Sequence, residues 1–263
     1  MKFTTLSSAA IVAALTIGAL APTVALADAT ELDSTGTVTV EEGGTDPDEE
    51  IDTVDPEEPG ETLPEPNPEG PDEITNPDRG PLMIEKVTNL EFGTIKTSAN
   101  EVTAFASPMM FGEGDNATTR GAYVQWRDVR AGGTFGYTVT AQMTQQFTGK
   151  DTNKLTGSTI NFSNGFIAAQ GDNTNVIPSS TGAFQLTESN DAVAVVTADQ
   201  DKEEGKGRYI MAFGDSRNET DANSVKLTVP AATASNMAED DYVAKVTWKV
   251  VAAPTADEDD TEA

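Results

Sequence analysis

The sequence contains no cysteine and no histidine. Without cysteine, the chain has no disulfide, no thiol nucleophile and no thiolate zinc site. Without histidine, Ser-His-Asp and Cys-His catalysis and nearly all catalytic zinc sites are excluded. These absences remove the commonest enzymatic and metal-binding chemistries. We therefore predict that the protein has no metal site and no cofactor.

Basic residues are also scarce. Sixteen lysines and arginines stand against 44 acidic residues, which gives a formal net charge of −28. A chain with this charge repels phosphate backbones and anionic lipid surfaces, so we expect no nucleic-acid partner. A secreted protein of this size without disulfides is typical of Gram-positive bacteria.

Residues 1–27 have the pattern of a secretory signal peptide. A basic start at Lys2 precedes the apolar run 9–21, and Ala25-Leu26-Ala27 offers small residues at the cleavage positions. The alternative is a retained membrane anchor, but the run is shorter than the ~20 residues that a membrane-spanning helix needs. We therefore predict cleavage after Ala27, secretion, and no transmembrane segment in the mature chain.

Residues 28–81 form an acidic, proline-rich segment. It contains 19 acidic residues, one basic residue and nine of the chain's 14 prolines. Charge repulsion and fixed proline φ angles favour an extended, disordered linker. The run Thr37-Val38-Thr39-Val40 could pair as a strand, but nothing nearby in the sequence would cover it. The segment is interpreted either as a spacer that holds the domain away from another structure or as an uncommitted disordered tail.

Ordered structure is predicted to begin at Leu82, where short segments of strand character alternate with Gly- and Asn-rich turns. These strands are predicted at 84–95, 101–106, 121–130, 135–144, 158–170, 183–187, 192–198, 207–213, 224–229 and 241–251. No window of helical length after the signal peptide carries a convincing helical stripe. We predict an all-β domain over 82–254, an antiparallel β-sandwich or barrel-like fold, followed by an acidic tail at 255–263.

The segment 242–254 is predicted to be the closing strand of this domain. One face, at period two, carries the apolar residues Tyr242, Ala244, Val246, Trp248 and Val250. The other face carries Lys245, Thr247 and Lys249, with Val243 and Val251 at its ends. This alternation predicts a strand with one buried face. Pro254 ends it because proline cannot donate to a ladder.

A second organising strand is predicted over 136–143. Its residues Tyr137, Val139, Ala141 and Met143 share one face. The pattern aromatic-x-aliphatic occurs here as Tyr137-Thr138-Val139 and recurs in the closing strand as Trp248-Lys249-Val250. Three further motifs precede the first copy: Leu90-Glu91-Phe92-Gly93-Thr94, Asp128-Val129-Arg130 and Gly132-Gly133. A fourth, Gly205-Lys206-Gly207 with Tyr209, lies between the two copies.

In their order and spacing these motifs resemble the WxL domain of Gram-positive surface proteins, which carries two Trp-x-Leu motifs. The resemblance covers residues 82–254. The chain departs from the family pattern at Tyr137, where the first Trp is expected, and at Val139 and Val250, where both Leu are expected. The resemblance implies a secreted cell-surface protein attached non-covalently to peptidoglycan. It also implies other WxL-family surface proteins as further partners.

Three aromatic residues are the candidate ligand-binding residues. Trp248 is interpreted as a core residue of the closing strand, with ligand contact as the alternative. Trp126 shares a face with Val124 and Asp128, and it is either a core residue or an exposed platform for a sugar ring. Tyr137 is predicted in the core with its hydroxyl on a hydrogen-bond partner.

Two other functions differ from wall attachment. The main alternative is a partner-binding subunit of a multi-protein WxL surface complex, with little wall affinity of its own. An enzyme that cleaves wall glycan would need two carboxylates at a fixed separation. Nothing in the sequence brings Asp128, Glu188 or Asp191 together. We therefore predict a binding protein and not an enzyme.

Overall fold

The structure is a computed structural model that describes residues 34–114, 117–188 and 191–253. The predicted signal peptide, Pro254 and the predicted tail at 255–263 lie outside these residues. The chain divides into two compact units, Met1–Val40 and Glu41–Ala263. In the first unit, residues 34–40 are extended and exposed, and the second unit contains the sheets described below.

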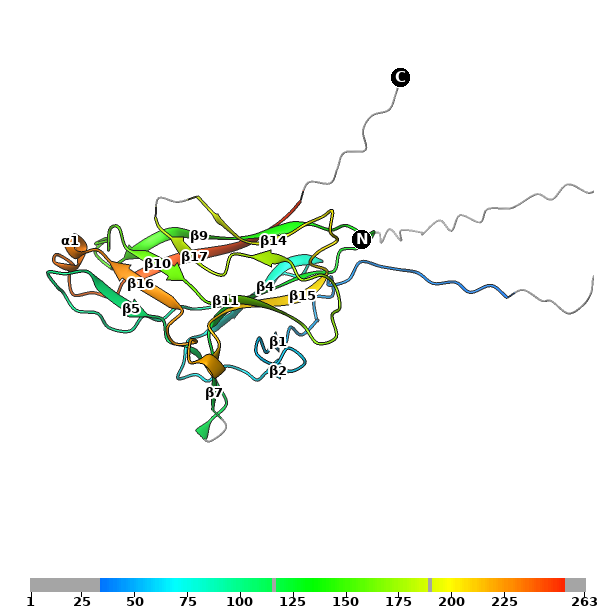
Figure 1. Cartoon of the computed structure of the whole chain (residues 1–263), viewed down its shortest axis with the longest axis horizontal. Coiled ribbons are helices and arrows are strands. Elements are labelled where there is room, and N and C mark those ends of the chain that lie inside the picture. The colour runs from blue at the N-terminus through cyan, green and yellow to red at the C-terminus, as the bar shows by residue number, and fades with distance from the viewer. Residues whose placement is uncertain (1–33, 115–116, 189–190, 254–263) are drawn as a thin grey trace, which may run out of the picture. The chain divides into compact units, whose positions relative to one another are not determined.

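Three larger antiparallel sheets form most of the second unit (Figure 1). In spatial order, the β9 sheet contains β12 (Ser179–Ser180), β14 (Val193–Ala198), β9 (Tyr137–Thr148) and β17 (Val243–Ala252). The β8 sheet contains β11 (Gly165–Ala169), β15 (Gly207–Phe213), β8 (Ala122–Asp128), β4 (Leu82–Thr88) and β3 (Glu73–Thr75). The β16 sheet contains β13 (Phe184–Leu186), β10 (Thr159–Phe162), β16 (Val225–Val229) and β5 (Val102–Phe105).

The remaining elements are short. Two-stranded sheets pair β1 (Thr53–Val54) with β2 (Thr62–Leu63) and β6 (Met109–Phe111) with β7 (Thr118–Arg120). Among the described residues, the helical elements are α1 (Ala231–Ala234) and the 3-10 turn η2 (Ser216–Asn218), and Gly114 also has 3-10 conformation. The predicted all-β, antiparallel fold class is therefore confirmed.

The central core lies between the β9 sheet on one side and the β8 and β16 sheets on the other. Figure 1 shows β9, β14 and β17 in one layer and β4, β11 and β15 in the next. Along β9, the side chains of Tyr137, Val139, Ala141 and Met143 are buried, while the residues between them are half-buried. The period-two pattern predicted for this strand is thus confirmed, and it places this face of β9 in the core from Tyr137 to Met143.

The closing strand β17 pairs antiparallel with β9, with Trp248 opposite Ala141 and Val250 opposite Val139. Its half-buried residues are Ala244, Val246, Trp248 and Val250, and its exposed residues include Lys245, Thr247 and Lys249. The two faces predicted from the sequence are therefore the two faces observed. The fold is closed by contacts between segments about one hundred residues apart, such as Thr140 with Lys249.

Strand β8 is buried on both faces. Ala122, Val124 and Trp126 belong to the central core. Tyr123 points to the other side of the sheet, into a second core of Val54, Leu63, Met109, Phe111, Ala168, Ile210 and Ala212. Residues of β1, β2 and β6 thus cover the outer face of the β8 sheet as a third layer, and Figure 1 shows β1 and β2 on that side.

The prediction of a disordered linker up to residue 81 is wrong from Glu41 onward. Residues 41–81 belong to the same compact unit as the sheets, and Ile51, Val54 and Leu63 within them are buried. The backbone N–H of Val54 donates to the side chain of Gln125 on β8 at 2.9 Å. The sequence argument assumed that the acidic residues repel each other in water. In the structure, several of them pair with arginines of the β8 sheet and adjoining strands.

Two predicted strands also differ from those observed. The strand predicted at 84–95 ends at Thr88, and 89–97 continue without regular secondary structure. The strand predicted at 158–170 is divided into β10 and β11, which belong to different sheets. Asn164 lies between them with φ 52°, a left-handed conformation that asparagine tolerates in turns. The prediction of one strand was wrong because the apolar pattern continues on both sides of the turn at Asn164.

Truncation tests whether the acidic segment is structural. A chain that begins at Leu82 should lose several degrees of melting temperature or fail to fold, because it exposes the second core and leaves buried arginines unpaired. Removing one partner of a buried ion pair alone costs about 3–5 kcal/mol. A chain that begins at Glu41 is the control and should melt like the longer protein. Equal melting temperatures for the two truncations would show that the segment does not stabilise the domain.

Candidate functional site

The first aromatic motif lies in the core. Trp126 of β8 is 0% exposed and Tyr137 of β9 is 1% exposed. The indole N–H of Trp126 donates to the Tyr137 hydroxyl at 2.7 Å, and that hydroxyl donates to the Gly205 carbonyl at 3.2 Å. The ring of Tyr209 stacks on Trp126 with a centroid distance of 5.9 Å. The prediction that Tyr137 is a core residue with a partner for its hydroxyl is confirmed.

The alternative of Trp126 as an exposed sugar platform is wrong, because its ring has no solvent-accessible face. Its surroundings leave no space for a ligand either. Gly205 approaches so closely that a Cβ there would lie 2.7 Å from the Tyr137 hydroxyl oxygen, and its φ is +89°. Glycine is therefore required at this position by both space and backbone conformation. The motif Gly205-Lys206-Gly207 completes the core around the first aromatic motif.

The second aromatic motif is only partly in the core. Trp248 is half-buried on β17. Its ring meets Phe162 and Phe184 edge-on at centroid distances of 6.0 and 6.3 Å, and it lies tilted against Phe213 at 6.2 Å. The ring is thus held by the core while part of it remains accessible. The three candidate residues are not brought together in one site: Trp126 and Tyr137 form a buried pair, and Trp248 alone reaches a groove.

That groove, which we call the aromatic groove, runs between the start of β17 and the segment 89–97. A part of about 410 Å³ is lined by aromatic residues including Phe92, Phe147, Tyr242 and Trp248. An adjoining part of about 1030 Å³ shares Phe92, Phe147 and Tyr242. Phe92 packs edge-on against Phe147 at 5.9 Å. The segment 89–97, predicted as part of a strand, instead forms one wall of this groove.

The groove combines aromatic faces with polar groups. Asn89 and Glu91 line it on one side, and Lys96 and Asp240 line the adjoining part. Phe92 and Tyr242 are half-buried, so part of each ring is accessible. Accessible aromatic rings pack against the C–H faces of sugars, while amide, carboxylate and ammonium groups bind hydroxyls. The arrangement is suited to a glycan or to an extended peptide.

A buried charge layer covers the outer face of the β8 sheet. Arg127, whose side chain is 3% exposed, pairs with Glu49 at 2.7 Å and with Glu85 at 3.4 Å. Arg208 makes two hydrogen bonds to the Glu85 carboxylate, at 2.7 and 2.9 Å. Gln125 also donates to Glu85, at 2.9 Å. Because an unpaired buried charge is costly, these arginines need the acidic residues that surround them.

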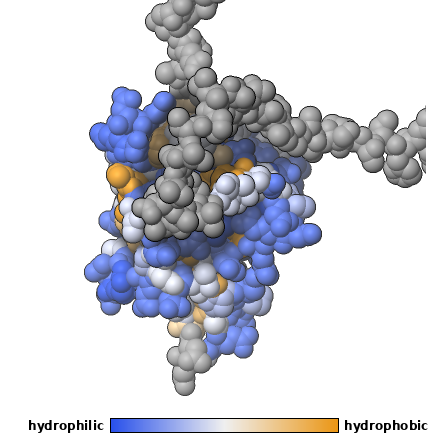
Figure 2. Space-filling model, turned by 90° about the vertical axis from the view of Figure 1, so that its right-hand side faces the viewer, coloured by the Kyte–Doolittle hydropathy of each residue, from blue (hydrophilic) through white to orange (hydrophobic). Residues whose placement is uncertain are grey.

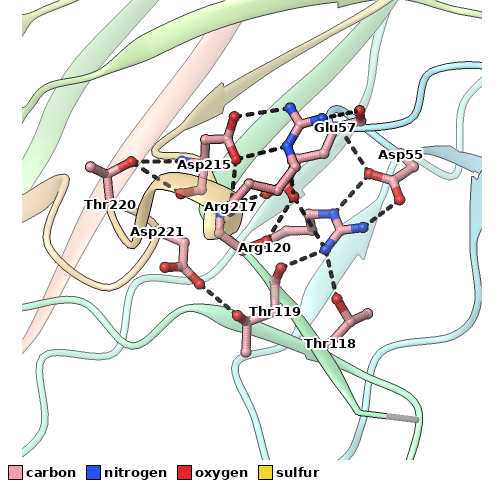
Figure 3. A network of polar contacts seen from close by, with 10 residues as sticks. Asp55, Glu57, Thr118, Thr119, Arg120, Asp215, Arg217, Thr220 and Asp221 are labelled. Atoms are coloured by element: carbon pink, nitrogen blue, oxygen red, sulfur yellow. Dashed lines mark hydrogen bonds and ion pairs between the residues drawn. The ribbon is translucent and has the colours of Figure 1, made fainter.

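A second part of the layer joins the N-terminal segment to strand β7 and to the 3-10 turn η2 (Figure 3). Arg120 binds both oxygens of Asp55, at 2.8 and 2.6 Å. Glu57 accepts hydrogen bonds from the backbone N–H and the hydroxyl of Ser216, both at 2.7 Å. Arg217 pairs with Asp215 and donates to the Glu57 carbonyl. These contacts fasten β1 and its flanking residues to distant parts of the chain.

A third part centres on Glu73. Its carboxylate accepts hydrogen bonds from Lys86 at 2.7 Å and from the hydroxyls of Thr53 and Tyr123. Burial and the neighbouring carboxylate raise the pKa of Tyr123 above its ordinary value, so this hydroxyl remains a donor. Sequence reasoning missed the whole layer. The sequence feature that could have revealed the layer is the alternation of Gln125 and Arg127 with Val124 and Trp126. The structure shows that this strand, β8, is buried throughout.

Of the three acidic residues considered for catalysis, two form ion pairs and the third is exposed. Asp128 is buried and pairs with Arg130 at 2.7 Å and with Lys206 at 3.2 Å. Glu188 pairs with Lys154 at 3.0 Å, and Asp191 is exposed. In the part of the chain that the structure describes, no group of three or more His, Cys, Asp or Glu residues is placed to hold a metal ion.

Comparison with known proteins gives one match. A family model described as "WxL domain surface cell wall-binding" matches residues 27–254, which includes the N-terminal segment that covers the β8 sheet. No curated protein and no solved structure matches. Among the described residues, no helix has the length and apolar character needed to cross a membrane.

The Trp126–Tyr137 pair generates a stability prediction. Tyr137→Phe removes the acceptor of the indole N–H and the donor to Gly205, and it should lower the free energy of unfolding by about 1–3 kcal/mol. Tyr242→Phe is the matched control, because the Tyr242 hydroxyl bonds only to the exposed Ala238 carbonyl among the described residues. Chemical denaturation measures both variants. Equal losses would mean that the buried hydroxyl is not a structural partner.

The Asp55–Arg120 pair generates a pH prediction. Burial raises the pKa of Asp55, but the hydrogen bonds from Arg120 and from backbone N–H groups outweigh it, so the pKa lies below the ordinary value of 3.8. The pair's contribution to stability is therefore complete above pH 3.8 and is lost as the pH falls through the lower, folded-state pKa. Asp55→Asn should be less stable at neutral pH by about 3 kcal/mol. Denaturation midpoints measured from pH 7 downward should converge for the two proteins in acid, and a constant difference at all pH values would contradict the assignment.

Proposed function

The chain belongs to the WxL domain family of surface proteins that bind the cell wall, and from this premise we propose that it attaches non-covalently to peptidoglycan through the aromatic groove. In this proposal the protein is secreted by a Gram-positive bacterium and remains at its surface. The observation that carries the proposal is the position of Trp248, the family-motif tryptophan, which is held by the core but lines the groove.

The two aromatic motifs then have different roles. Tyr137, in place of the first tryptophan, bonds Trp126 inside the core and acts only through the fold. Trp248 supplies part of the floor of the groove, and Phe92 and Tyr242 supply its walls. Val139 and Val250, which replace the family leucines, lie opposite each other in the β9–β17 pair. The substitutions therefore affect packing between these strands and leave the aromatic lining of the groove unchanged.

The charge of the chain bears on which wall polymer it can bind. On the face seen in Figure 2, hydrophobic residues form small patches within a mainly hydrophilic surface. The net charge of −28 opposes direct binding of a polyanionic wall polymer. Peptidoglycan offers sugar rings for the aromatic residues and amide and hydroxyl groups for the polar ones. We propose binding without catalysis, so incubation with labelled peptidoglycan should release no soluble fragments.

Substitutions in the groove test the proposal. Tyr242→Ala and Phe92→Ala should each weaken binding to purified peptidoglycan about tenfold, the equivalent of one aromatic contact of about 1.4 kcal/mol. Phe105→Ala is the control, because Phe105 is 47% exposed on β5 of another sheet. Sedimentation with purified peptidoglycan measures binding, and melting curves show that each variant is folded.

The same assay separates the alternative function. A partner-binding subunit of a WxL surface complex would leave purified peptidoglycan unbound and would sediment only with walls that retain their proteins. If the protein binds peptidoglycan and both groove variants bind it with unchanged affinity, the binding site lies outside the groove.

A further inference from the structure

The outer edge of β17 is an unpaired strand edge. β17 is ten residues long and stands last in the order β12-β14-β9-β17. One of its edges pairs with β9, and no described strand pairs with the other. Every second backbone N–H and C=O along that edge lacks a ladder partner among the described strands, and β4 lies close to part of it. The part that β4 leaves open is a template for another strand. A long edge of this kind is usually shortened, covered or interrupted.

The side chains along this edge set the chemistry of a partner strand. Lys245 and Lys249 are exposed, and neither has an ion-pair partner among the described residues. On the inner side, Val246 and Trp248 line the 410 Å³ part of the aromatic groove, which Ile74 also lines. An added strand would match both rows if it carried acidic side chains on its outer face and small apolar side chains on its inner face.

The chain contains a segment with this pattern. Val38 and Val40 are 89% and 81% exposed, although they are surrounded by threonines with strong β propensity. In an extended conformation, Val38 and Val40 share one face, and Thr37, Thr39 and Glu41 share the other. The segment 34–42 forms no strand in the structure. The segment thus has the sequence of a strand but pairs with no described strand, and one edge of β17 also lacks a paired strand among the described residues.

We propose that residues 37–41 of one copy add as an antiparallel strand to the free edge of β17 in a second copy. The register places Glu41 opposite Lys245, Thr39 opposite Thr247, and Thr37 opposite Lys249. Val40 and Val38 then lie opposite Val246 and Trp248, and their side chains enter the groove. Acidic–basic and apolar–apolar pairs are formed on the appropriate faces.

Symmetric pairing of β17 with its own copy is less favourable. Two β17 strands centred on Thr247 would place Lys245 of each opposite Lys249 of the other, and like charges directly opposite destabilise a sheet. The proposed contact instead joins two different surfaces. Such a heterologous contact leaves a free donor segment and a free edge at the ends, so further copies can be added to an open array. Because Val38 and Val40 would enter the part of the groove that Val246 and Trp248 line, the added strand would compete there with the ligand proposed for the groove. The assembly needs no such ligand and goes beyond wall binding by a single copy.

Charge reversal tests the assembly in the full chain. We expect the unmodified protein to associate with increasing concentration in sedimentation-velocity experiments. Glu41→Lys and Lys245→Glu should each weaken self-association about tenfold, because each opposes like charges in the register. An equimolar mixture of the two variants should recover association, since Lys at position 41 of one variant meets Glu at position 245 of the other. Lys226→Glu on β16 makes the same charge change in another sheet and should have no effect.

Three results would overturn the proposal: an unmodified protein that stays monomeric at every concentration, a mixture that associates no better than its components, or a Lys226→Glu variant that loses association equally. If Glu41→Lys lowers the melting temperature while the protein is monomeric throughout, the segment pairs within its own chain and the two-copy assembly is wrong. Val38→Asp, with Val176→Asp as control, checks the apolar row independently, since both valines are exposed.

Discussion

Burial of arginine on the outer face of the β8 sheet is the constraint on which the rest of the structure depends. Strand β8 is buried along both faces, and Arg127 keeps only 3% of its side chain exposed. A guanidinium in that position requires carboxylates, and the chain supplies them from Glu85 on the neighbouring strand and Glu49 in the N-terminal segment. The segment must therefore fold with the sheets. Some of the acidic residues that give the chain its large negative charge are therefore buried and neutralise buried arginines, and they are not solvated at the surface.

The elements that followed from the sequence are those with a local signal. The alternation in β9 and β17 identified both strands, their buried faces and their place in one domain, because a period of two is visible within ten residues. The acidic segment was assigned wrongly because its partners lie far away: Asp55 meets Arg120, and Glu57 meets Ser216, 159 residues later. Composition describes how a segment behaves alone, and it carries no information about a distant arginine.

The candidate site was predictable only in part, for a related reason. Trp248 was identified from its motif, but Phe92 and Tyr242 join it only because the chain after β4 leaves the sheet and runs beside the start of β17. The apolar residues at 90–95 resemble a strand, and the backbone conformation that makes them a groove wall depends on tertiary contacts. Trp126 had the same ambiguity between core and surface. It was resolved by a partner, Tyr137, on a strand of the opposite sheet.

The pairing of Glu57 with Ser216 also determines when the chain can fold. A chain that emerges N-terminus first presents its acidic segment long before the arginines that accept it, and β17, the last described strand, completes the β9 sheet. No disulfide can fix an early intermediate, because the chain has no cysteine. Native structure is therefore acquired only when nearly the whole polypeptide is available. Until then the highly charged leading segment remains hydrated and unfolded, the condition in which a polypeptide can be threaded through a narrow channel.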